Sequence, residues 1–226
     1  MPKLTPPGED NNPPPSPRQS IQAKKLPAQQ RATETYERIL TVTAETLADV
    51  GIERLSTNLI CERAGLTPPA LYRYFPNKYA LLGVLGERLL TRQNDLIGLW
   101  ITPDMLLGPP ENVERALASL ILETYRVTHE MVGGMWILKS LRAVPLLEHI
   151  RLDSHRRVAQ AQAQIISDAF PTVDRTAINE VSRVVVEMAH ATVELLFDEA
   201  MDATHVSNMM AAMMTSYLGR LQNSAG

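Results

Sequence analysis

Helix-stop and helix-start signals lie close together in one stretch of the N-terminal half of the chain. Gly51 and Gly65 can each end a helix, because glycine adopts the left-handed conformation without steric cost. Pro68 and Pro69 suit the first turn of a helix, where backbone N–H groups have no intrahelical partner and the fixed φ of proline is already helical. Pro76 ends that helix, because the residue before a proline is pushed out of the α region. The spacing predicts two short helices between two longer ones.

Apolar periodicity and caps support the same division. From Tyr36 to Val50, apolar residues recur at three- and four-residue steps, the spacing of one face of a helix. Ser56 or Thr57 can cap the first short helix, and Asn77 can cap the long helix that follows. These positions predict helices on both sides of the short pair.

Beyond residue 100 the periodicity stays helical. It predicts five further segments, near 110–130, 131–143, 146–169, 173–200 and 205–222. Prolines, glycines and Asp202 separate them. No stretch alternates apolar and polar residues between turn pairs, so no strand is predicted. The predicted fold class is all-α.

Composition favours a soluble cytoplasmic protein. No apolar run approaches the ~18 residues that a membrane span needs. The N-terminus lacks the basic segment and apolar stretch of a signal peptide. The one cysteine, Cys61, leaves no internal disulfide and suits a reducing compartment. The five histidines show no metal-ligand spacing, so neither a metal nor a cofactor is predicted.

The net charge of −3 is unevenly distributed along the chain. Residues 1–78 carry 10 Lys and Arg against 8 Asp and Glu, a net +2, whereas residues 79–226 carry a net −5. The contrast is modest, but it makes the N-terminal part the half that can meet phosphate. Within it, residues 1–29 hold half of the chain's 16 prolines and few apolar residues, which predicts a disordered tail.

The two short helices have the dimensions of a helix-turn-helix. Ile60, Cys61 and Ala64 give the first of them a small apolar face on which the second can pack. Leu71 and Phe75 are four residues apart and predict the buried side of the second helix. The N-terminal residues of that helix then face outward, as they do where a recognition helix meets base edges in DNA.

The segment STNLICERAGLTPPALYRYFPNKYALL resembles the helix-turn-helix of the tetracycline-repressor (TetR) family of bacterial regulators. The shared pattern is a capped short helix, Ala-Gly-apolar-Ser/Thr, Leu-Tyr-aromatic-x-Phe, and then a lysine and a leucine pair. The resemblance covers about residues 31–90. It implies a DNA-binding domain at 30–90, with its motif at 56–75, and a helical effector-binding and dimerisation domain at 91–226.

The resemblance also implies a set of DNA-contacting residues at the helix-turn-helix. They are Ser56, Thr57, Thr67, Pro68, Pro69, Ala70, Tyr72, Arg73, Tyr74 and Lys78. Residues 67–70 fall where the family meets base edges, and Tyr72 and Lys78 fall at its phosphate contacts. The proline pair departs from the family pattern, and neither proline nor alanine can donate a hydrogen bond to a base. Specificity is therefore expected to rest on thymine methyl contacts, on Arg73 and Tyr74, and on DNA shape.

The helices after residue 100 suggest a pocket and a dimer interface. Flexible methionines and aromatic residues suit a soft apolar pocket, although ordinary core packing explains them equally. The predicted pocket residues are Trp100, Met105, Tyr125, His129, Met135, Trp136 and Leu141. The last two long helices each carry a broad apolar face, and by resemblance they would pair with their copies in a four-helix bundle. The predicted interface residues are Val181, Val185, Met188, Met209, Met210, Met213 and Tyr217.

These features predict a homodimeric transcriptional regulator, a repressor released from a pseudopalindromic operator by a small apolar effector. One alternative is a DNA-binding regulator whose C-terminal domain binds a protein partner and no ligand. A helical-bundle enzyme is a remote alternative. The sequence offers no Ser/His/Asp order, Gly-rich phosphate loop or paired-carboxylate motif, so no enzymatic activity is predicted.

Overall fold

The computed structural model describes residues 30–223, so the predicted N-terminal tail lies outside the described residues. The described residues form helices and connecting turns without a strand, which confirms the all-α prediction. No helix in this range is long and apolar enough to cross a membrane. No group of three or more described His, Cys, Asp or Glu side chains is arranged to hold a metal ion.

Three helices form the N-terminal end of the molecule. They are α1 (Gln30–Arg54), α2 (Thr57–Ala64) and α3 (Pro68–Tyr72). Gly51, with φ of +72°, interrupts α1 near its C-terminus as the glycine signal predicts. The Ser56 hydroxyl caps α2 by accepting the N–H of Leu59 at 3.2 Å, and Gly65 ends α2 with φ of +61°.

The long helix α4 (Lys78–Asp95) joins this end to the rest of the chain. The side-chain oxygen of Asn77 accepts the N–H of Ala80 at 3.0 Å and so caps the helix, as predicted. The helix runs without a break across residue 90, the predicted boundary between the two domains. The two parts of the molecule therefore share α4.

Eight further elements complete the fold. They are α5 (Ile97–Trp100), α6 (Pro103–Leu106), α7 (Pro110–Glu130), α8 (Gly134–Ala143), the short 3-10 helix η1 (Pro145–Leu147), α9 (Glu148–Ala169), α10 (Arg175–Asp198) and α11 (Ala203–Asn223). The five long helices match the five predicted segments within a few residues. The sequence patterns missed α5, α6 and η1, because an element of three or four residues is too short to show a period.

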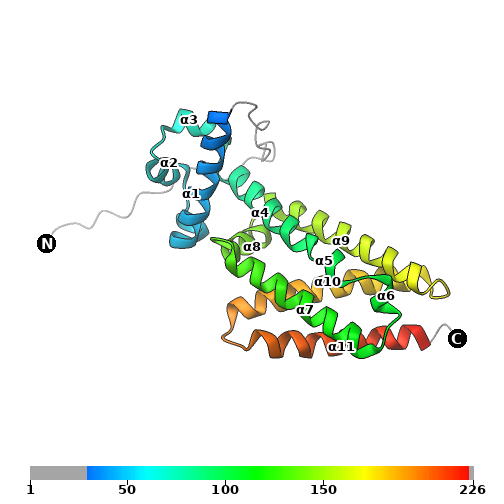
Figure 1. Ribbon diagram of the computed structural model, residues 1–226. Coiled ribbons are helices and arrows are strands. Elements are labelled where there is room, and N and C mark those ends of the chain that lie inside the picture. The colour runs from blue at the N-terminus through cyan, green and yellow to red at the C-terminus, as the bar shows by residue number, and fades with distance from the viewer. Residues whose placement is uncertain (1–29, 224–226) are drawn as a thin grey trace.

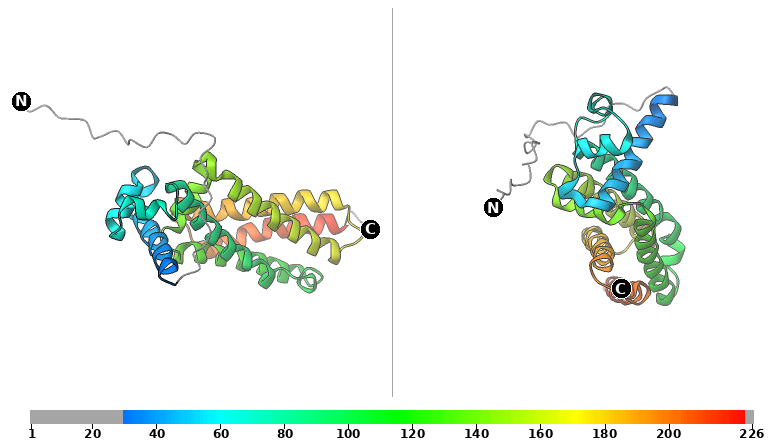
Figure 2. Two further views of the ribbon diagram at one scale, coloured as in Figure 1. Left: turned by 90° about the horizontal axis from the view of Figure 1, so that it is seen from above. Right: turned by 90° about the vertical axis from the view of Figure 1, so that its left-hand side faces the viewer.

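The long helices form an elongated bundle with α1–α3 at one end (Figures 1 and 2). In the bundle, α11 packs chiefly on α7, and α10 packs on α9. Helix α4 enters the bundle from the N-terminal end and contacts α7, α8 and α9. The C-terminal end of α11 lies at the far end from α2 and α3 (Figure 2).

Helix α8 fills the junction between the two ends, because it packs on both α1 and α4. The Trp136 ring covers Gly51, where a Cβ would lie 3.4 Å from the ring. Gly86 of α4 lies so close to Leu141 that a Cβ would fall 2.6 Å from its methyl group. An ion pair between Glu37 and Arg88, with two N–O distances of 2.7 Å, also ties α1 to α4. The junction is therefore closely packed.

Candidate nucleic-acid interface

The short helix α3 is anchored by one buried side chain within it and by another just after it. Leu71 and Phe75 are both 0% exposed, as their spacing predicts. The Phe75 ring stacks on Tyr36 of α1, with 4.8 Å between ring centroids. Cys61 is buried beneath them, and burial raises the pKa of its thiol, so it packs as a small apolar side chain.

The opposite side of α3 faces solvent. Its exposed surface consists of Thr67, Pro68, Pro69, half-buried Ala70 and Arg73, and is called the reading surface below. The Thr67 hydroxyl makes no capping bond to α3. Two prolines and an alanine make the start of this helix apolar, so these three side chains can make only apolar contacts. The sequence predicted this outward orientation correctly.

Tyr72 sits beside the reading surface, 42% exposed, with its hydroxyl 3.1 Å from Thr57 Oγ1. The Thr57 side chain is only 8% exposed. This side chain holds the Tyr72 hydroxyl in place, and its direct contact with DNA stays a prediction. The Ser56 hydroxyl is occupied as the cap of α2.

Tyr74 and Lys78 have structural contacts as well as predicted DNA contacts. The Tyr74 ring is half-buried and meets Tyr36 edge to face, 6.3 Å between centroids. Lys78 Nζ donates a hydrogen bond to the carbonyl of Leu55 at 2.9 Å, which joins the start of α4 to the link between α1 and α2. An ammonium group has three donors, so this bond is compatible with a phosphate contact. The DNA-binding role of both residues stays a prediction.

The seven predicted pocket residues do not line one cavity. Tyr125 and His129 pack against Phe197, with 4.8 and 6.3 Å between ring centroids. Trp136 covers Gly51 at the junction, and Leu141 is fully buried against α4. The other three lie apart from these, Trp100 on α5, Met105 on α6 and Met135 on α8. These contacts give the seven residues separate surroundings and do not support a single pocket, because sequence proximity does not show which way each helix faces.

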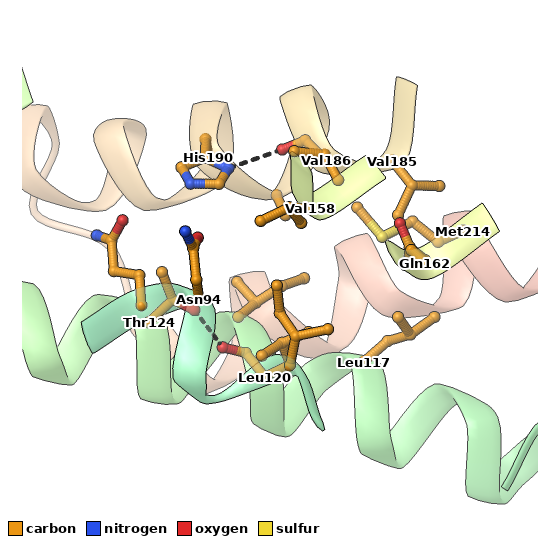
Figure 3. A pocket seen from close by; sticks show the side chains of 14 residues that line it. Asn94, Leu117, Leu120, Thr124, Val158, Gln162, Val185, Val186, His190 and Met214 are labelled. Atoms are coloured by element: carbon orange, nitrogen blue, oxygen red, sulfur yellow. Dashed lines mark hydrogen bonds between the residues drawn. The ribbon is translucent and has the colours of Figure 1, made fainter. Parts of the chain in front are cut away.

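A different cavity lies in the middle of the bundle (Figure 3). Its volume is about 50 Å³. Six helices, α4, α5, α7, α9, α10 and α11, contribute to its wall. The lining residues are Gln93, Asn94, Ile97, Leu117, Leu120, Ile121, Thr124, Val158, Gln162, Val185, Val186, Ala189, His190 and Met214. One signal of this cavity in the sequence is a polar residue on an otherwise apolar helix face, as at Gln162.

Part of the predicted dimer interface is exposed in the single chain, and its role in a dimer stays a prediction. Met209, Met213 and Tyr217 of α11 are exposed large apolar side chains, with Met213 55% exposed. Val181 and Val185 of α10 are buried within the chain's own core, at 7% and 8% exposure. These two valines are therefore core residues of the single chain and not the surface residues that the sequence had suggested.

A neighbouring stripe of α10 carries the exposed apolar residues. Val184 and Leu195 are exposed, and Met188 between them is partly buried. The apolar face of α10 is broader than its buried part, so periodicity alone does not show which of its apolar residues are buried.

Comparison with known proteins identifies the N-terminal part. Residues 39–85 match the family model described as bacterial regulatory proteins of the tetR family. The chain is 47% identical over 55 residues to tetracycline repressor protein class C of Escherichia coli, which is 24% of this chain and 25% of that protein. It is 32% identical over 93 residues to the HTH-type transcriptional regulator YvdT of Bacillus subtilis, 41% of this chain and 45% of that protein. The chain thus spans between a quarter and a half of the length of these relatives.

Solved structures resemble the whole fold. A TetR-family transcriptional regulator from Syntrophomonas wolfei superposes with a TM-score of 0.65 at 12% identity, over 84% of this chain and 97% of that one. A tetR-family regulator from Streptomyces coelicolor gives a TM-score of 0.61 at 18% identity, over 85% and 88%. At such low identity the likeness shows the fold alone. The named relatives are transcriptional regulators and not enzymes, in agreement with the sequence-based prediction. Residues 39–85 therefore match the TetR family of bacterial regulatory proteins, and the fold of the described residues resembles that of TetR-family regulators.

Proposed function

We propose that the protein is a homodimeric DNA-binding transcriptional regulator, a repressor that a small ligand releases from its operator. The observation that carries the DNA-binding part is the reading surface. It projects from a helix fixed by fully buried Leu71 and Phe75, inside the segment that matches the tetR family. Recognition helices in the helix-turn-helix class meet base edges with the corresponding N-terminal residues.

In this proposal the chemistry of the reading surface sets the mode of recognition. Pro68, Pro69 and Ala70 offer only apolar contact, which suits thymine methyl groups in the major groove. Arg73 is exposed and adds a cation beside them. Tyr72 and Lys78 would meet phosphates on either side and fix the register without reading sequence.

Dimerisation would use the exposed apolar stripes of α10 and α11. Val184 and Leu195 of α10 and Met209, Met213 and Tyr217 of α11 remain exposed in the single chain. The two helices contact each other, so the stripes belong to adjacent helices. A twofold axis there would place two reading surfaces on half-sites about 34–36 Å apart, or a multiple of this, on a pseudopalindrome.

Helix α4 would connect the ligand to the DNA. Gln93 and Asn94, near the C-terminus of α4, line the cavity, and Lys78 at its N-terminus lies beside the reading surface. The contact of Gly86 with Leu141 leaves little space for α4 to move without α8. A ligand would release DNA only if it binds one position of α4 more tightly than the other.

The substitution Lys78→Ala tests the phosphate contact. Because one cation is lost per copy, each half-site should lose one phosphate contact, and the slope of log K against log salt should fall by about 0.9 per contact. Affinity should weaken similarly for every DNA sequence. Fluorescence anisotropy at several salt concentrations measures both the affinity for each DNA sequence and the slope with salt. The control is Lys139→Ala. It removes a cation on α8 that is paired with Asp198 on α10. An unchanged slope would remove Lys78 from the DNA contacts.

The substitution Ala70→Asn tests base reading. An asparagine amide can pair with adenine through two hydrogen bonds, so one position in each half-site should gain a preference for adenine of about 1–3 kcal/mol. Binding to an operator series with each base at each position measures this. The expected pattern differs from that of Lys78→Ala, which weakens all operators together. Uniform weakening by Ala70→Asn would show that residue 70 does not face the bases.

A further inference from the structure

The cavity in the bundle contains buried polar atoms without a hydrogen-bond partner. They are Gln93 Oε1, Gln162 Oε1 and His190 Nε2, and all three residues line the cavity. An unpaired polar group in an apolar interior costs about 1–3 kcal/mol. Three of them around one cavity indicate a place where a bound molecule completes the hydrogen bonding.

The orientation of the Gln93 amide follows from a chain of hydrogen bonds. The Thr128 hydroxyl donates its hydrogen to the carbonyl of Thr124, at 2.7 Å. It can therefore only accept at its 2.7 Å contact with Gln93, which must present Nε2. The oxygen of the Gln93 amide is left over as an unpaired acceptor.

The tautomer of His190 follows in the same way. Its Nδ1 lies 2.9 Å from the carbonyl of Val186, which can only accept, so Nδ1 carries the hydrogen (Figure 3). Burial lowers the pKa of His190, which keeps the ring neutral at pH 7. Nε2 is then an acceptor. His155, 4.0 Å away between ring centroids, is neutral too, because burial lowers its pKa to about 4.

The wall of the cavity carries no formal charge to match an anion. None of its 14 lining residues is Asp, Glu, Lys or Arg. Most are aliphatic, so the body of a ligand must be apolar. A carboxylate there would face the acceptors of Gln93 and His190 with no cation among the lining residues, and burying it unpaired would be costly.

We propose that this cavity binds an uncharged molecule with an apolar body that donates hydrogen bonds, from hydroxyl or amide N–H groups, to Gln93 Oε1 and His190 Nε2. The cavity does not bind the carboxylates that correspond to such molecules. The inference rests on the proposed function only in treating this cavity as the effector site. It narrows the effector to a chemical class.

Matched probes test the class of ligand. The series is 4-ethylphenol, 4-ethylanisole and 4-ethylbenzoate, together with the primary alcohols, methyl ethers and carboxylates of six to ten carbons. Thermal unfolding and calorimetric titration of the full chain give the affinity of each. The phenol and the alcohols should bind at least about tenfold more tightly than their ethers, and the carboxylates should not bind. A carboxylate that binds as tightly as its alcohol, or a series in which nothing binds, overturns the proposal.

A pair of variants localises the effect. Gln93→Met keeps the length of the side chain and removes one of the two acceptors, so the preference for the phenol over the ether should fall. Gln160→Met, at an exposed position of α9, is the control and should keep the preference. If Gln93→Met fails to fold, His190→Leu removes the other acceptor, and the preference for the phenol over the ether is measured in that variant. A variant that folds and keeps the full preference places the donor contact elsewhere and overturns the proposal.

The DNA-binding measurement separates this inference from the proposed function. Operator binding without ligand depends on the reading surface and on the dimer. A protein that binds its operator but ignores the whole probe series would overturn only the ligand class. A protein that binds the probes as expected but no DNA would overturn the proposed function and leave the ligand class intact.

Discussion

Replacing Met213 with glutamate is expected to convert the protein to single copies and to weaken operator binding by more than about a hundredfold. Met213 is 55% exposed on α11, within the apolar stripe of Met209 and Tyr217. A carboxylate there would be buried without a partner in a twofold interface, which costs several kcal/mol per copy. Each half-site would then be bound separately, and the advantage of two linked reading surfaces would be lost.

Analytical ultracentrifugation and DNA titration measure the two effects of Met213→Glu together. Gln160→Glu adds the same charge at an exposed position of α9 and should remain a dimer with normal affinity. Circular dichroism should show an unchanged helix content in both variants, because neither position is in the core. A Met213→Glu protein that still sediments as a dimer would show that the exposed stripe of α11 is not the interface.

Gly133→Ala is expected to lower the free energy of unfolding by more than about 3 kcal/mol. Gly133 immediately precedes α8 as its N-cap, with φ of +71°, a conformation that costs an alanine about 1–2 kcal/mol. A Cβ there would lie 2.8 Å from the carbonyl oxygen of Ala44 on α1. Because that atom belongs to a helix backbone, it cannot move aside as a flexible side chain would, and the contact between α8 and α1 must open.

Gly65→Ala separates the two causes. Gly65 also has a positive φ, +61°, but nothing lies within 4 Å of its Cβ position. This substitution should cost only the conformational part, about 1–2 kcal/mol. Denaturant unfolding at one fixed protein concentration measures both variants, since dimerisation also contributes to stability. Equal losses in the two variants would mean that the close approach of α8 to α1 adds nothing to stability.

The helix-turn-helix could be predicted in detail because its signals are local. Gly65 ends α2, Pro68 opens α3, and the spacing of Leu71 and Phe75 gives the buried side. Each signal acts within four residues of its position, so one sequence contains all the information needed. The resemblance to a known family then supplied the expected roles of the exposed residues.

The cavity could not be predicted, because its wall comes from six helices that are distant in sequence. Gln93 and His190 are nearly a hundred residues apart, and only tertiary packing brings them to one space. The sequence did not show which apolar residues of α10 are exposed, for a related reason. Val181 and Val184 are both apolar and differ by less than one helical turn, and the packing of α9 and α7 decides which of them is buried.

Selection of binding sites from random DNA duplexes tests the central claim most directly. The full chain should enrich a pseudopalindrome whose half-sites are one helical turn or a whole multiple apart, about 34–36 Å per turn. Two copies should bind each selected duplex, as measured by titration at a duplex concentration far above the dissociation constant. Failure to enrich any sequence, or enrichment of one asymmetric site bound by a single copy, would contradict the account.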